Sequence, residues 1–350
     1  MSKSLVALSG GVDSSVAAFL TKEKGFETFG ITLKLNSAAA DENSCLDCDD
    51  ISLAKQVCDT LGIKHEVIDF CPDFEKNVID RFVGGYLNGE TPNPCVDCNR
   101  YIKFPKMFQL ADDVGAEFVV TGHYAQIEKS GDRFLLKKGA YDMKDQSYVL
   151  YSLKQSQLSR IMFPIGNMKK DEVRQIASTL GFLNSNKPDS QDICFVKDND
   201  YVSYIENRLS KKFEQGDFVD KNGNFIAKHK GIISYTIGQR KGLGIASTEP
   251  YYVIGKDVEK NQVILGRMAD QFSESMIVKN VNFIPFDSIE KEYRCSVKIR
   301  YKHKEAPAAL IPLGSDKVKV IFDEAQKAVT KGQSAVFYDG DYVVGGGIIE

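Results

Sequence analysis

Seven residues near the N-terminus, Ser9–Ser15 (SGGVDSS), have the types and spacing of a phosphate-binding loop. The adjacent Gly10 and Gly11 let the backbone approach a bulky anion and adopt conformations that other residues avoid. The serine hydroxyls add hydrogen-bond donors, and Asp13 can hold a Mg²⁺ ion that is bound to phosphate. No Gly-Lys-Ser/Thr follows, so the loop is not of the Walker type. The alternative interpretation is a serine-capped glycine turn that binds nothing.

Cysteines form the second chemical pattern. In a cytosolic chain of this size they indicate metal binding, redox work or catalysis rather than a disulfide framework. Cys58 and Cys295 stand inside apolar patterns, so we expect them in the core. Cys45 and Cys48 form an isolated C-x-x-C in a polar stretch, for which an exposed pair without function is favoured over a metal site. The eight cysteines are Cys45, Cys48, Cys58, Cys71, Cys95, Cys98, Cys194 and Cys295.

Two cysteines are better placed for chemistry. Cys98 ends the string TPNPCVDC (91–98), whose prolines predict a rigid loop that can carry a reactive thiol. Cys194 ends a second proline-containing string, PDSQDIC. A cysteine acts as nucleophile or sulfur carrier only as the thiolate, which nearby positive charge stabilises. Arg100 and Lys103 are the candidate charges for the first string.

Strands and helices must position these groups. Residues 4–8 are typical of a buried parallel strand and 16–24 of an amphipathic helix, so the phosphate loop is expected at a helix N-terminus, where free N–H groups face an anion. Similar alternation over residues 1–200 predicts a doubly wound α/β fold, a parallel sheet with helices on both faces. Ligands of such sheets bind beyond the carboxyl ends of the strands, so Ser9 and 121–123 are expected to meet in one crevice. Further strands are expected within 26–35, 64–70 and 116–124, and helices that end at Gly62 and Gly115.

The pattern changes after about residue 205. Residues 216–245 indicate short strands around an Asn-Gly turn, and 251–267 indicate a further hairpin. From residue 275 onward, short β-runs with regular turn signals predict a small antiparallel barrel. We therefore expect a catalytic α/β domain at 1–204, a small β-rich connector at 205–272 and a C-terminal β-barrel at 273–350.

Composition limits the class of protein. The 350 residues are 43% hydrophobic and 27% charged, which is typical of a soluble globular protein. No apolar run approaches the length of a membrane span, and the polar SGGVDSS string excludes a signal peptide in the first twenty residues, so we expect a cytoplasmic protein. The net charge of −3 is only a weak argument against nucleic-acid binding, because a local basic face is enough to bind phosphate.

Taken together, these motifs resemble those of the tRNA-specific 2-thiouridylases, the MnmA family, essentially from end to end. The phosphate loop resembles that of ATP pyrophosphatases, enzymes that cleave ATP between the α and β phosphates. The resemblance implies an adenine nucleotide alpha-hydrolase-like catalytic domain followed by the connector and barrel. The motifs that carry it are SGGVDSS (9–15), TPNPCVDCNRYIKF (91–104), TGHYA (121–125), KDQSYVL (144–150), PDSQDICF (188–195), YTIGQRKGLGI (235–245), RYKH (300–303) and GQSAVFYDGDYVVGGG (332–347).

The resemblance also implies a reaction. ATP, with Mg²⁺, would adenylate O2 of the wobble uridine in the tRNAs for Lys, Glu and Gln, with release of pyrophosphate. Sulfur held as a cysteine persulfide would then replace the activated oxygen and give 2-thiouridine and AMP. A cysteine desulfurase or a sulfur-relay protein is the expected sulfur donor, no membrane is involved, and we expect a monomer.

By motif match, Cys98 takes the position of the family's nucleophile and Cys194 that of the persulfide carrier. The expected ATP-binding positions are Ala7, Leu8, Ser9, Gly10, Gly11, Val12, Asp13, Ser14, Leu33 and Gly122. The stretch expected to meet the target base is Asn93, Pro94 and Cys95. The expected tRNA-contacting positions are His123, Lys144, Asp145, Gln146, Arg300, Tyr301 and Gln333. Taken alone, His123 would be a hydrogen-bonded core histidine and Arg300 part of a solvated strand face.

One position departs from the family's common form, since many members carry Asp where this chain has Cys95. Two routes for sulfur therefore stay open. In the first, Cys194 carries a persulfide and Cys98 resolves it, which closes a disulfide that a reductant must open. In the second, Cys95, Cys98 and Cys194 hold a [4Fe–4S] cluster whose open iron delivers sulfide, and no disulfide forms. We favour the persulfide route.

Two other classes of function compete with this interpretation. An adenylating amidotransferase similar to GMP synthetase would need an ammonia source, and it would leave Cys98 and Cys194 idle. A non-catalytic tRNA-binding or metal-storage protein would not need an intact phosphate loop. For tRNA binding, we expect the GQRKGLG loop (238–244) and the barrel to hold the anticodon stem through phosphate and shape contacts.

Overall fold

The computed structural model describes residues 1–35, 46–189 and 192–350, and the chain divides into two compact units. No helix within these described ranges is long and apolar enough to cross a membrane. Cys45 lies outside the described residues, as does the side chain of Cys48, so the role of this C-x-x-C stays a prediction. The first unit consists of Met1–Val78, Cys95–Gln191 and Gly340–Val344, and the second of Ile79–Pro94, Asp192–Asp339 and Gly345–Glu350.

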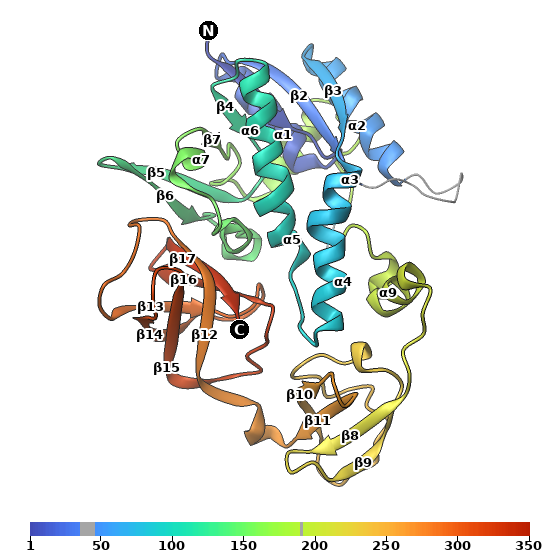
Figure 1. The fold of residues 1–350 in the computed structure, drawn as a ribbon. Helices are drawn as coiled ribbons and strands as arrows, with labels where there is room; N and C mark the ends of the chain where they lie inside the picture. The colour runs from blue at the N-terminus through green and yellow to red at the C-terminus, as the bar shows by residue number, and fades with distance from the viewer. Residues whose placement is uncertain (36–45, 190–191) are drawn as a thin grey trace. The chain divides into compact units, whose positions relative to one another are not determined.

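A five-stranded parallel sheet with strand order β3-β2-β1-β4-β7 forms the centre of the first unit (Figure 1). Leu5 and Val6, neighbours on β1, are both almost fully buried, because both faces of the sheet are covered. This confirms the parallel sheet expected from the alternating pattern. The strands are β1 (Lys3–Ala7), β2 (Glu27–Lys34), β3 (Lys64–Asp69), β4 (Phe118–Val120) and β7 (Ile161–Met162).

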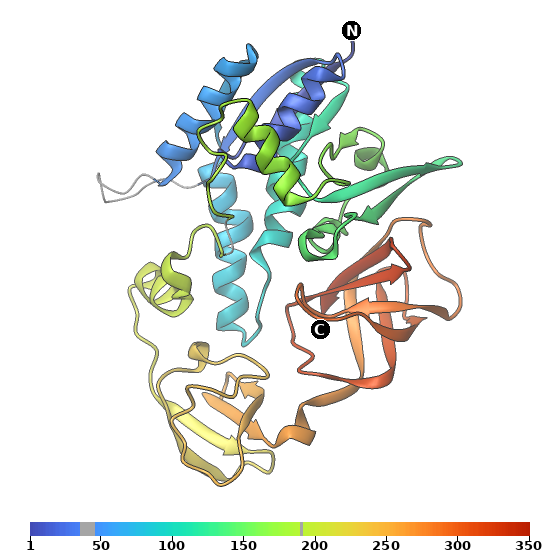
Figure 2. The ribbon, with the colours of Figure 1, turned by 180° about the vertical axis from the view of Figure 1, so that it is seen from behind.

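Helices cover both faces of this sheet. On one face, Val16 of α1 and Ala54 of α2 share a core cluster with Val6 of β1, and α8 adds to it (Figure 2). On the other face, α6 contacts β1 and β4 (Figure 1). Gly62 and Gly115 have positive φ angles of 62° and 66° just beyond α2 and α6, as expected for helix C-termini. The helices are α1 (Val12–Glu23), α2 (Leu46–Leu61), α6 (Phe104–Asp113) and α8 (Lys170–Thr179).

The backbone around Cys98 is helical rather than a loop. The short helix α5 (Pro94–Asp97), the π-helical segment η2 (Cys98–Lys103) and α6 follow one another without a break. The rigid loop predicted for 91–98 is therefore wrong for its second half. Pro94 begins the helix, a position that tolerates proline because the first helical residues have no intrahelical partner for their N–H groups. Single π-helical turns inside α-helices occur frequently at functional sites.

The remaining elements of the first unit were not predicted from the sequence. An antiparallel hairpin follows β4, and its second strand pairs at Lys137 with Tyr342 of β17. A further π-helical segment lies between α3 and α4. These elements are α3 (Cys71–Phe74), η1 (Glu75–Ile79), β5 (Ala125–Ser130), β6 (Arg133–Lys138) and α7 (Gln155–Leu158).

The second unit contains two β-structures, as the sequence predicts. Two antiparallel hairpins, β8–β9 and β10–β11, join through a parallel β8–β11 pairing into a sheet of order β10-β11-β8-β9. The first hairpin turns at Asn222–Gly223, where Gly223 has a φ of 86°. The elements are α4 (Asp80–Leu87), α9 (Tyr201–Leu209), β8 (Gly216–Asp220), β9 (Phe225–His229), β10 (Tyr252–Asp257) and β11 (Gln262–Gly266).

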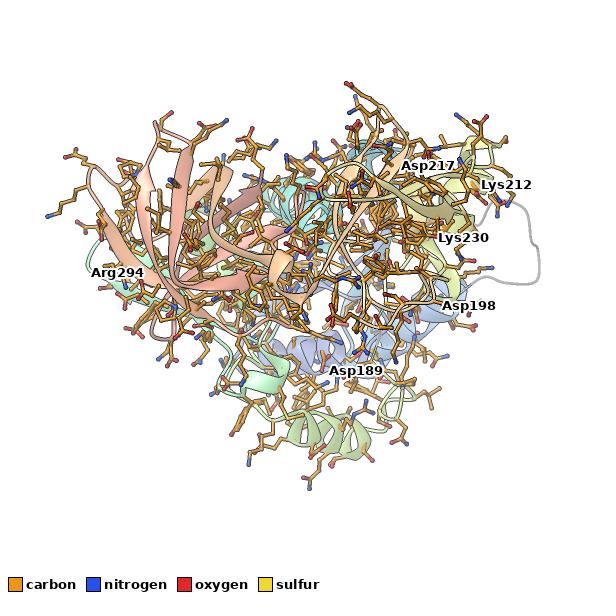
Figure 3. The ribbon with its side chains drawn as sticks, turned by 90° about the horizontal axis from the view of Figure 1, so that it is seen from below. Asp189, Asp198, Lys212, Asp217, Lys230 and Arg294 are labelled. Carbon is orange, nitrogen blue, oxygen red and sulfur yellow. The ribbon has the colours of Figure 1, made fainter. Side chains whose placement is uncertain are left out.

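The C-terminal strands form the expected closed barrel of order β12-β15-β14-β13-β16-β17, which the antiparallel β12–β17 pairing closes. Val297 of β13 and Phe337 of β16 are partners in this barrel, and both are fully buried inside it. Outside, Arg294, labelled in Figure 3, pairs with Asp323. The strands are β12 (Phe272–Phe283), β13 (Tyr293–Lys298), β14 (Ala306–Pro312), β15 (Lys317–Lys327), β16 (Ser334–Asp339) and β17 (Tyr342–Ile349).

Candidate active site

The phosphate loop connects β1 to α1 in a conformation that its glycines allow. Gly10 has a φ of +71°, and a Cβ atom there would lie 2.4 Å from the carbonyl oxygen of Asp50, so only glycine fits. The Oγ atom of Ser14 accepts a hydrogen bond from the N–H of Ser9 at 3.2 Å and donates one to the carbonyl oxygen of Gly11 at 3.0 Å. The hydroxyl of Ser14 therefore stabilises the loop itself.

Gly122 lies directly against this loop. A Cβ atom at Gly122 would come within 2.6 Å of the carbonyl carbon of Asp13 and of the amide nitrogen of Ser14. The contact arises because β1 and β4 are neighbouring parallel strands whose carboxyl ends point to the same edge. Leu33 lies near the carboxyl end of β2, the neighbour of β1 on its other side. The expected meeting of the two strand ends is confirmed, and ATP binding at this edge stays a prediction.

Asp13 in the loop is held by residues that are distant in the sequence. Lys170, the first residue of α8, places its Nζ atom 2.8 Å from both carboxylate oxygens of Asp13. The hydroxyl of Tyr124 donates a hydrogen bond to Asp13 Oδ1 at 2.7 Å. The Lys170 side chain is only 11% exposed, so its ammonium group is fixed beside the loop.

Asp189, labelled in Figure 3, is the second acidic group of this site and pairs with three cations. Its carboxylate lies 2.6 Å from Lys144, 2.6 Å from Lys170 and 3.3 Å from Arg174. Burial alone would raise the pKa of Asp189, but hydrogen bonds from Lys144 and Lys170 outweigh burial and lower the pKa to about 2. Lys144, an expected tRNA-contacting residue, thus belongs to the same ionic network as the phosphate loop.

The chain that leads toward Cys194 is attached to the phosphate loop before it reaches Asp189. The side-chain amide of Asn184 donates hydrogen bonds to the carbonyl oxygen of Gly10 and to Ser15 Oγ, each at 2.9 Å. The guanidinium group of Arg174 donates to two carbonyl groups within 185–187. Residues 184–189 therefore lie on the loop, held by side chains from both directions.

Lys170, Asn184 and Asp189 are not among the site residues expected from the sequence. Asp189 had a signal, because it stands inside PDSQDICF, one of the motifs that carry the family resemblance. Lys170 and Asn184 stand outside every motif that we recognised, and only the fold brings them to the loop.

Cys95 and Cys98 lie one helical turn apart, the first exposed and the second half-buried. Burial raises the pKa of Cys98 to about 11. Lys103 opposes this effect, as predicted, but it does not outweigh burial. The other expected cation, Arg100, lies over the ring of Tyr101. At neutral pH, Cys98 is therefore a thiol, and a change in its surroundings is needed to make it a nucleophile.

Cys194 is exposed and belongs to the second unit. The next residue, Phe195, packs against Phe82 of α4 and Tyr204 of α9 with ring centroids 5.3 Å apart in each case. The ring contacts of Phe195 therefore hold the backbone next to Cys194 in place. In the part of the chain that is described, no three His, Cys, Asp or Glu side chains gather as metal ligands, so the cluster route stays a prediction.

The other cysteines examined from the sequence fit a structural role. Cys58 is fully buried, as predicted, and Cys295 is half-buried on β13. Burial raises the pKa of each thiol to about 12. Neither group is a thiolate at neutral pH.

His123 follows Gly122 and faces inward. Its Nδ1 atom lies 2.8 Å from Thr121 Oγ1, and its ring contacts those of Phe104 and Phe163. Burial lowers the pKa of His123 well below its usual value, so the imidazole is neutral. The structure thus gives His123 the character of a hydrogen-bonded core histidine next to the loop.

Asp145 and Gln146 hold a turn. Asp145 is only 6% exposed, and its carboxylate accepts hydrogen bonds from the N–H of Gly139 and from both the N–H and the hydroxyl of Ser147. The side-chain oxygen of Gln146 accepts a hydrogen bond from the N–H of Tyr124. These two residues hold the turn that follows Lys144, and a direct role with tRNA stays a prediction.

In the second unit, Arg300 and Gln333 also bind other parts of the chain. Arg300 donates hydrogen bonds to the carbonyl oxygens of Ile237 and Ala328 and to the hydroxyl of Thr330. This guanidinium group therefore links the barrel to the segment that begins the 238–244 loop. Tyr301, by contrast, is 38% exposed.

Gln333 lies beside the stretch expected to meet the target base. Its side-chain amide donates to the carbonyl oxygen of Thr91 at 2.6 Å, and the N–H of Thr91 donates to Lys331 O. Gly332 lies so close to Glu90 that a Cβ atom there would be 2.9 Å from that residue's Cβ. The barrel turn 331–333 thus supports the chain just before Asn93 and Pro94.

Three family profiles match the chain in succession. Residues 2–198 match the family described as "tRNA methyl transferase HUP domain". Residues 202–267 match "tRNA methyl transferase PRC-barrel domain", and 273–349 match "Aminomethyltransferase beta-barrel domain".

Relatives that span the whole chain carry one name. The tRNA-specific 2-thiouridylase MnmA of Clostridioides difficile (strain 630) is 49% identical over 99% of this chain and 98% of its own length. That of Clostridium beijerinckii is 47% identical, with the same two coverages. Among solved structures, a 4-thiouridine synthetase in complex with RNA and ATP matches 60% of this chain and 50% of its own with 16% identity and a TM-score of 0.40, too low for any inference.

The profile names refer to methyl transfer, whereas the full-length relatives are named as thiouridylases. Identity near one half over almost the entire chain is the stronger evidence. This chain belongs to the MnmA family of tRNA-specific 2-thiouridylases.

Proposed function

We propose that the chain catalyses ATP-dependent 2-thiolation of the wobble uridine in the tRNAs for Lys, Glu and Gln. One observation carries the mechanism: residues 184–189 are attached to the phosphate loop through Asn184 and Asp189. Cys194 follows Asp189 by five residues, which span at most about 18 Å when fully extended. A short segment of the chain therefore connects Cys194, which would carry sulfur, to the phosphate loop, which would activate the uridine.

The phosphate loop supplies the activating half of the reaction. A uracil oxygen is a poor leaving group, and adenylation converts it into part of AMP, which leaves readily. Gly10 and Gly122 let the loop pack closely against Asp50 and against the end of β4, at the N-terminus of α1, which favours an anion. Carboxylate oxygens of Asp13 and Asp189 are ligands of the type that Mg²⁺ prefers, so these residues fit a magnesium–nucleotide complex.

The cysteines supply the transferring half. The exposed Cys194 thiol is accessible to a desulfurase or a sulfur-relay protein, which would load it as a persulfide. The terminal sulfur bonds to C2 of the activated uridine, and AMP leaves. The Cys98 thiolate then attacks the Cys194 sulfur, which breaks the S–S bond, releases the thiolated base and leaves a Cys98–Cys194 disulfide for a thiol reductant. The raised pKa of Cys98 suits this order, because the thiol is unreactive before tRNA reaches it.

For tRNA recognition, we propose that the 238–244 loop and the barrel contact the anticodon stem. Arg240 and Lys241 are exposed, and Arg300 anchors the start of their loop. Arg240→Ala and Lys241→Ala should each weaken tRNA binding and leave ATP binding intact. We also propose domain boundaries at 1–204, 205–272 and 273–350, and a monomeric state. A cytoplasmic location agrees with a reaction that uses tRNA and ATP.

The test uses the full-length protein, purified without oxygen, with unmodified tRNA, ATP, a desulfurase and cysteine. Mass spectrometry of nucleosides should show 2-thiouridine, and labelled ATP should give AMP. Cys98→Ser and Cys194→Ser should each abolish 2-thiouridine, whereas Cys295→Ser should not. ATP consumption that a small metabolite drives without tRNA would instead favour an amidotransferase.

Iron and acid-labile sulfide content separates the two sulfur routes. Protein without iron after attempted reconstitution supports the persulfide route. About four irons per chain, lost in Cys95→Ala, would replace it with the cluster route.

A further inference from the structure

The phosphate loop contains no cation of its own. Ser9–Ser15 includes one acidic residue and no lysine or arginine, whereas a Walker loop carries a lysine that reaches the β and γ phosphates. A triphosphate brings several negative charges to the loop, and backbone N–H groups offset them only in part. A cation from elsewhere in the fold is needed beside Asp13.

Lys170 occupies that place. Its Nζ atom lies 2.8 Å from both oxygens of Asp13, and its side chain is 11% exposed, so it is aimed at the loop rather than into solvent. The next lysine, Lys169, is exposed and lies over the ring of Tyr141. Lys170 therefore differs from Lys169 in the direction of its side chain, which its position in α8 determines, and not in its charge.

Lys170 forms ion pairs with two carboxylates, those of Asp13 and Asp189, and a magnesium–triphosphate complex would compete for these contacts. Mg²⁺ attracts Asp13, while phosphate oxygens attract the ammonium group. A lysine is a point charge on a flexible stem, so it can change partners without movement of the backbone.

We propose that Lys170 is an ATP-binding residue that exchanges Asp13 for the triphosphate, while Asp189 holds its ammonium group beside the loop. The proposal rests on the ATP-dependent reaction proposed above and adds a residue to it. Asp189 has the role of a positioning residue, because it pairs with Lys170.

Nucleotide binding tests the role of Lys170. The full-length protein and its Lys170→Ala, Lys170→Arg and Lys169→Ala variants would be titrated with Mg²⁺–ATP analogue and with AMP. Loss of a charge-assisted contact should weaken ATP analogue binding in Lys170→Ala by about tenfold or more, with AMP binding nearly unchanged because AMP lacks the β and γ phosphates. Lys170→Arg should restore part of the affinity, and Lys169→Ala should match wild type.

Each other outcome is informative. Equal loss of ATP analogue and AMP binding in Lys170→Ala, with normal folding by circular dichroism, would assign Lys170 a structural role and overturn the proposal. Wild-type affinity in Lys170→Ala would overturn it as well. Failure of the wild-type protein itself to bind ATP would remove the proposed function, which distinguishes the two failures.

Asp189→Asn tests the positioning role. It should weaken binding of the Mg²⁺–ATP analogue by less than Lys170→Ala does and leave AMP binding nearly unchanged, whereas Asp192→Asn, at a nearby exposed aspartate, should match wild type. Wild-type affinity for the ATP analogue in Asp189→Asn would show that Asp189 does not position Lys170.

Discussion

The side-chain amide of Asn184 donates a hydrogen bond to the carbonyl oxygen of Gly10 at 2.9 Å, across 174 positions of the chain. The amide also binds Ser15 Oγ, so one side chain that is 1% exposed holds both ends of the phosphate loop. Backbone groups of a ligand-binding loop rarely have regular partners, and here a distant asparagine provides one.

Asn184→Ala should therefore destabilise the protein. It leaves the Gly10 carbonyl oxygen without this partner in a buried place, which costs about 1–3 kcal/mol of unfolding free energy. Urea denaturation followed by circular dichroism measures the difference. Asn186→Ala, at an exposed asparagine two residues away, is the matched control, and an equal effect of both variants would contradict the role of the hydrogen bond.

Gly122→Ala should abolish ATP binding without unfolding the protein. The new methyl group would meet the backbone of Asp13 and Ser14 at 2.6 Å, and such overpacking costs about 1–3 kcal/mol. Gly84→Ala is the control, because a Cβ atom at Gly84 meets nothing within 4 Å. Isothermal titration with an ATP analogue measures the effect, and wild-type affinity in Gly122→Ala would refute the close approach.

The reactivity of Cys98 should rise with pH. Burial raises the pKa of Cys98 to about 11, so the thiolate fraction at pH 7 is small and increases about tenfold per pH unit up to pH 10. Alkylation rates from peptide mass spectrometry between pH 7 and 10 measure this. Lys103→Ala should slow the reaction further, whereas Lys106→Ala, which removes a nearby lysine of α6 that pairs with Asp73 of α3, should not. A plateau below pH 9 would contradict the shift.

The contribution of Asp189 to the free energy of unfolding should decrease at low pH. Its pKa in the folded protein, about 2, lies below the ordinary value of an aspartate, so its contribution to stability is complete above about pH 4 and is lost as the pH falls toward 2. After allowance for solvent screening, the contribution is about 1 kcal/mol. The difference in unfolding free energy between wild type and Asp189→Asn should therefore narrow between pH 4 and pH 2. A difference that is constant over this range would exclude the ionic network as its source.

Lysine should not replace Arg300. The guanidinium group donates to three acceptors, Ile237 O, Ala328 O and Thr330 Oγ1, all through its terminal Nη2 atom, and the shorter lysine side chain does not bring its nitrogen as far from the backbone. Arg300→Lys should lose nearly as much thermal stability and tRNA affinity as Arg300→Ala. Lys302→Ala, at an exposed lysine, should affect neither stability nor the loop. Full function of Arg300→Lys would show that charge alone matters at this position.

The sequence predicted those parts of the fold that depend on local patterns. Apolar runs such as 4–8 and glycines such as Gly62 report secondary structure through neighbours in the chain, and both predictions are confirmed. In the connector, the turn predicted from the residue types of Asn222 and Gly223 is also confirmed. Periodicity and turn residues therefore locate elements well when short-range preferences and burial agree.

Two kinds of feature escaped this reasoning. Lys170 and Asn184 form contacts with residues more than 150 positions away in the sequence. The residue type alone does not predict a contact at that separation. The prolines of 91–98 predict a loop that includes Pro94, although a proline is equally compatible with the first turn of a helix. The choice between these two depends on tertiary contacts that a local pattern does not contain.

The π-helical segment Cys98–Lys103 widens the helix directly after Cys95. A turn closed by i→i+5 hydrogen bonds holds one residue more than an α-helical turn, so this segment accommodates an extra residue while α5 and α6 continue on either side. Deletion of one residue that restored regular α-helix would leave the direction of Pro94–Asp97 relative to α6 nearly unchanged and would remove the wide turn that begins at Cys98. For this stretch, the number of residues therefore matters as well as their identity.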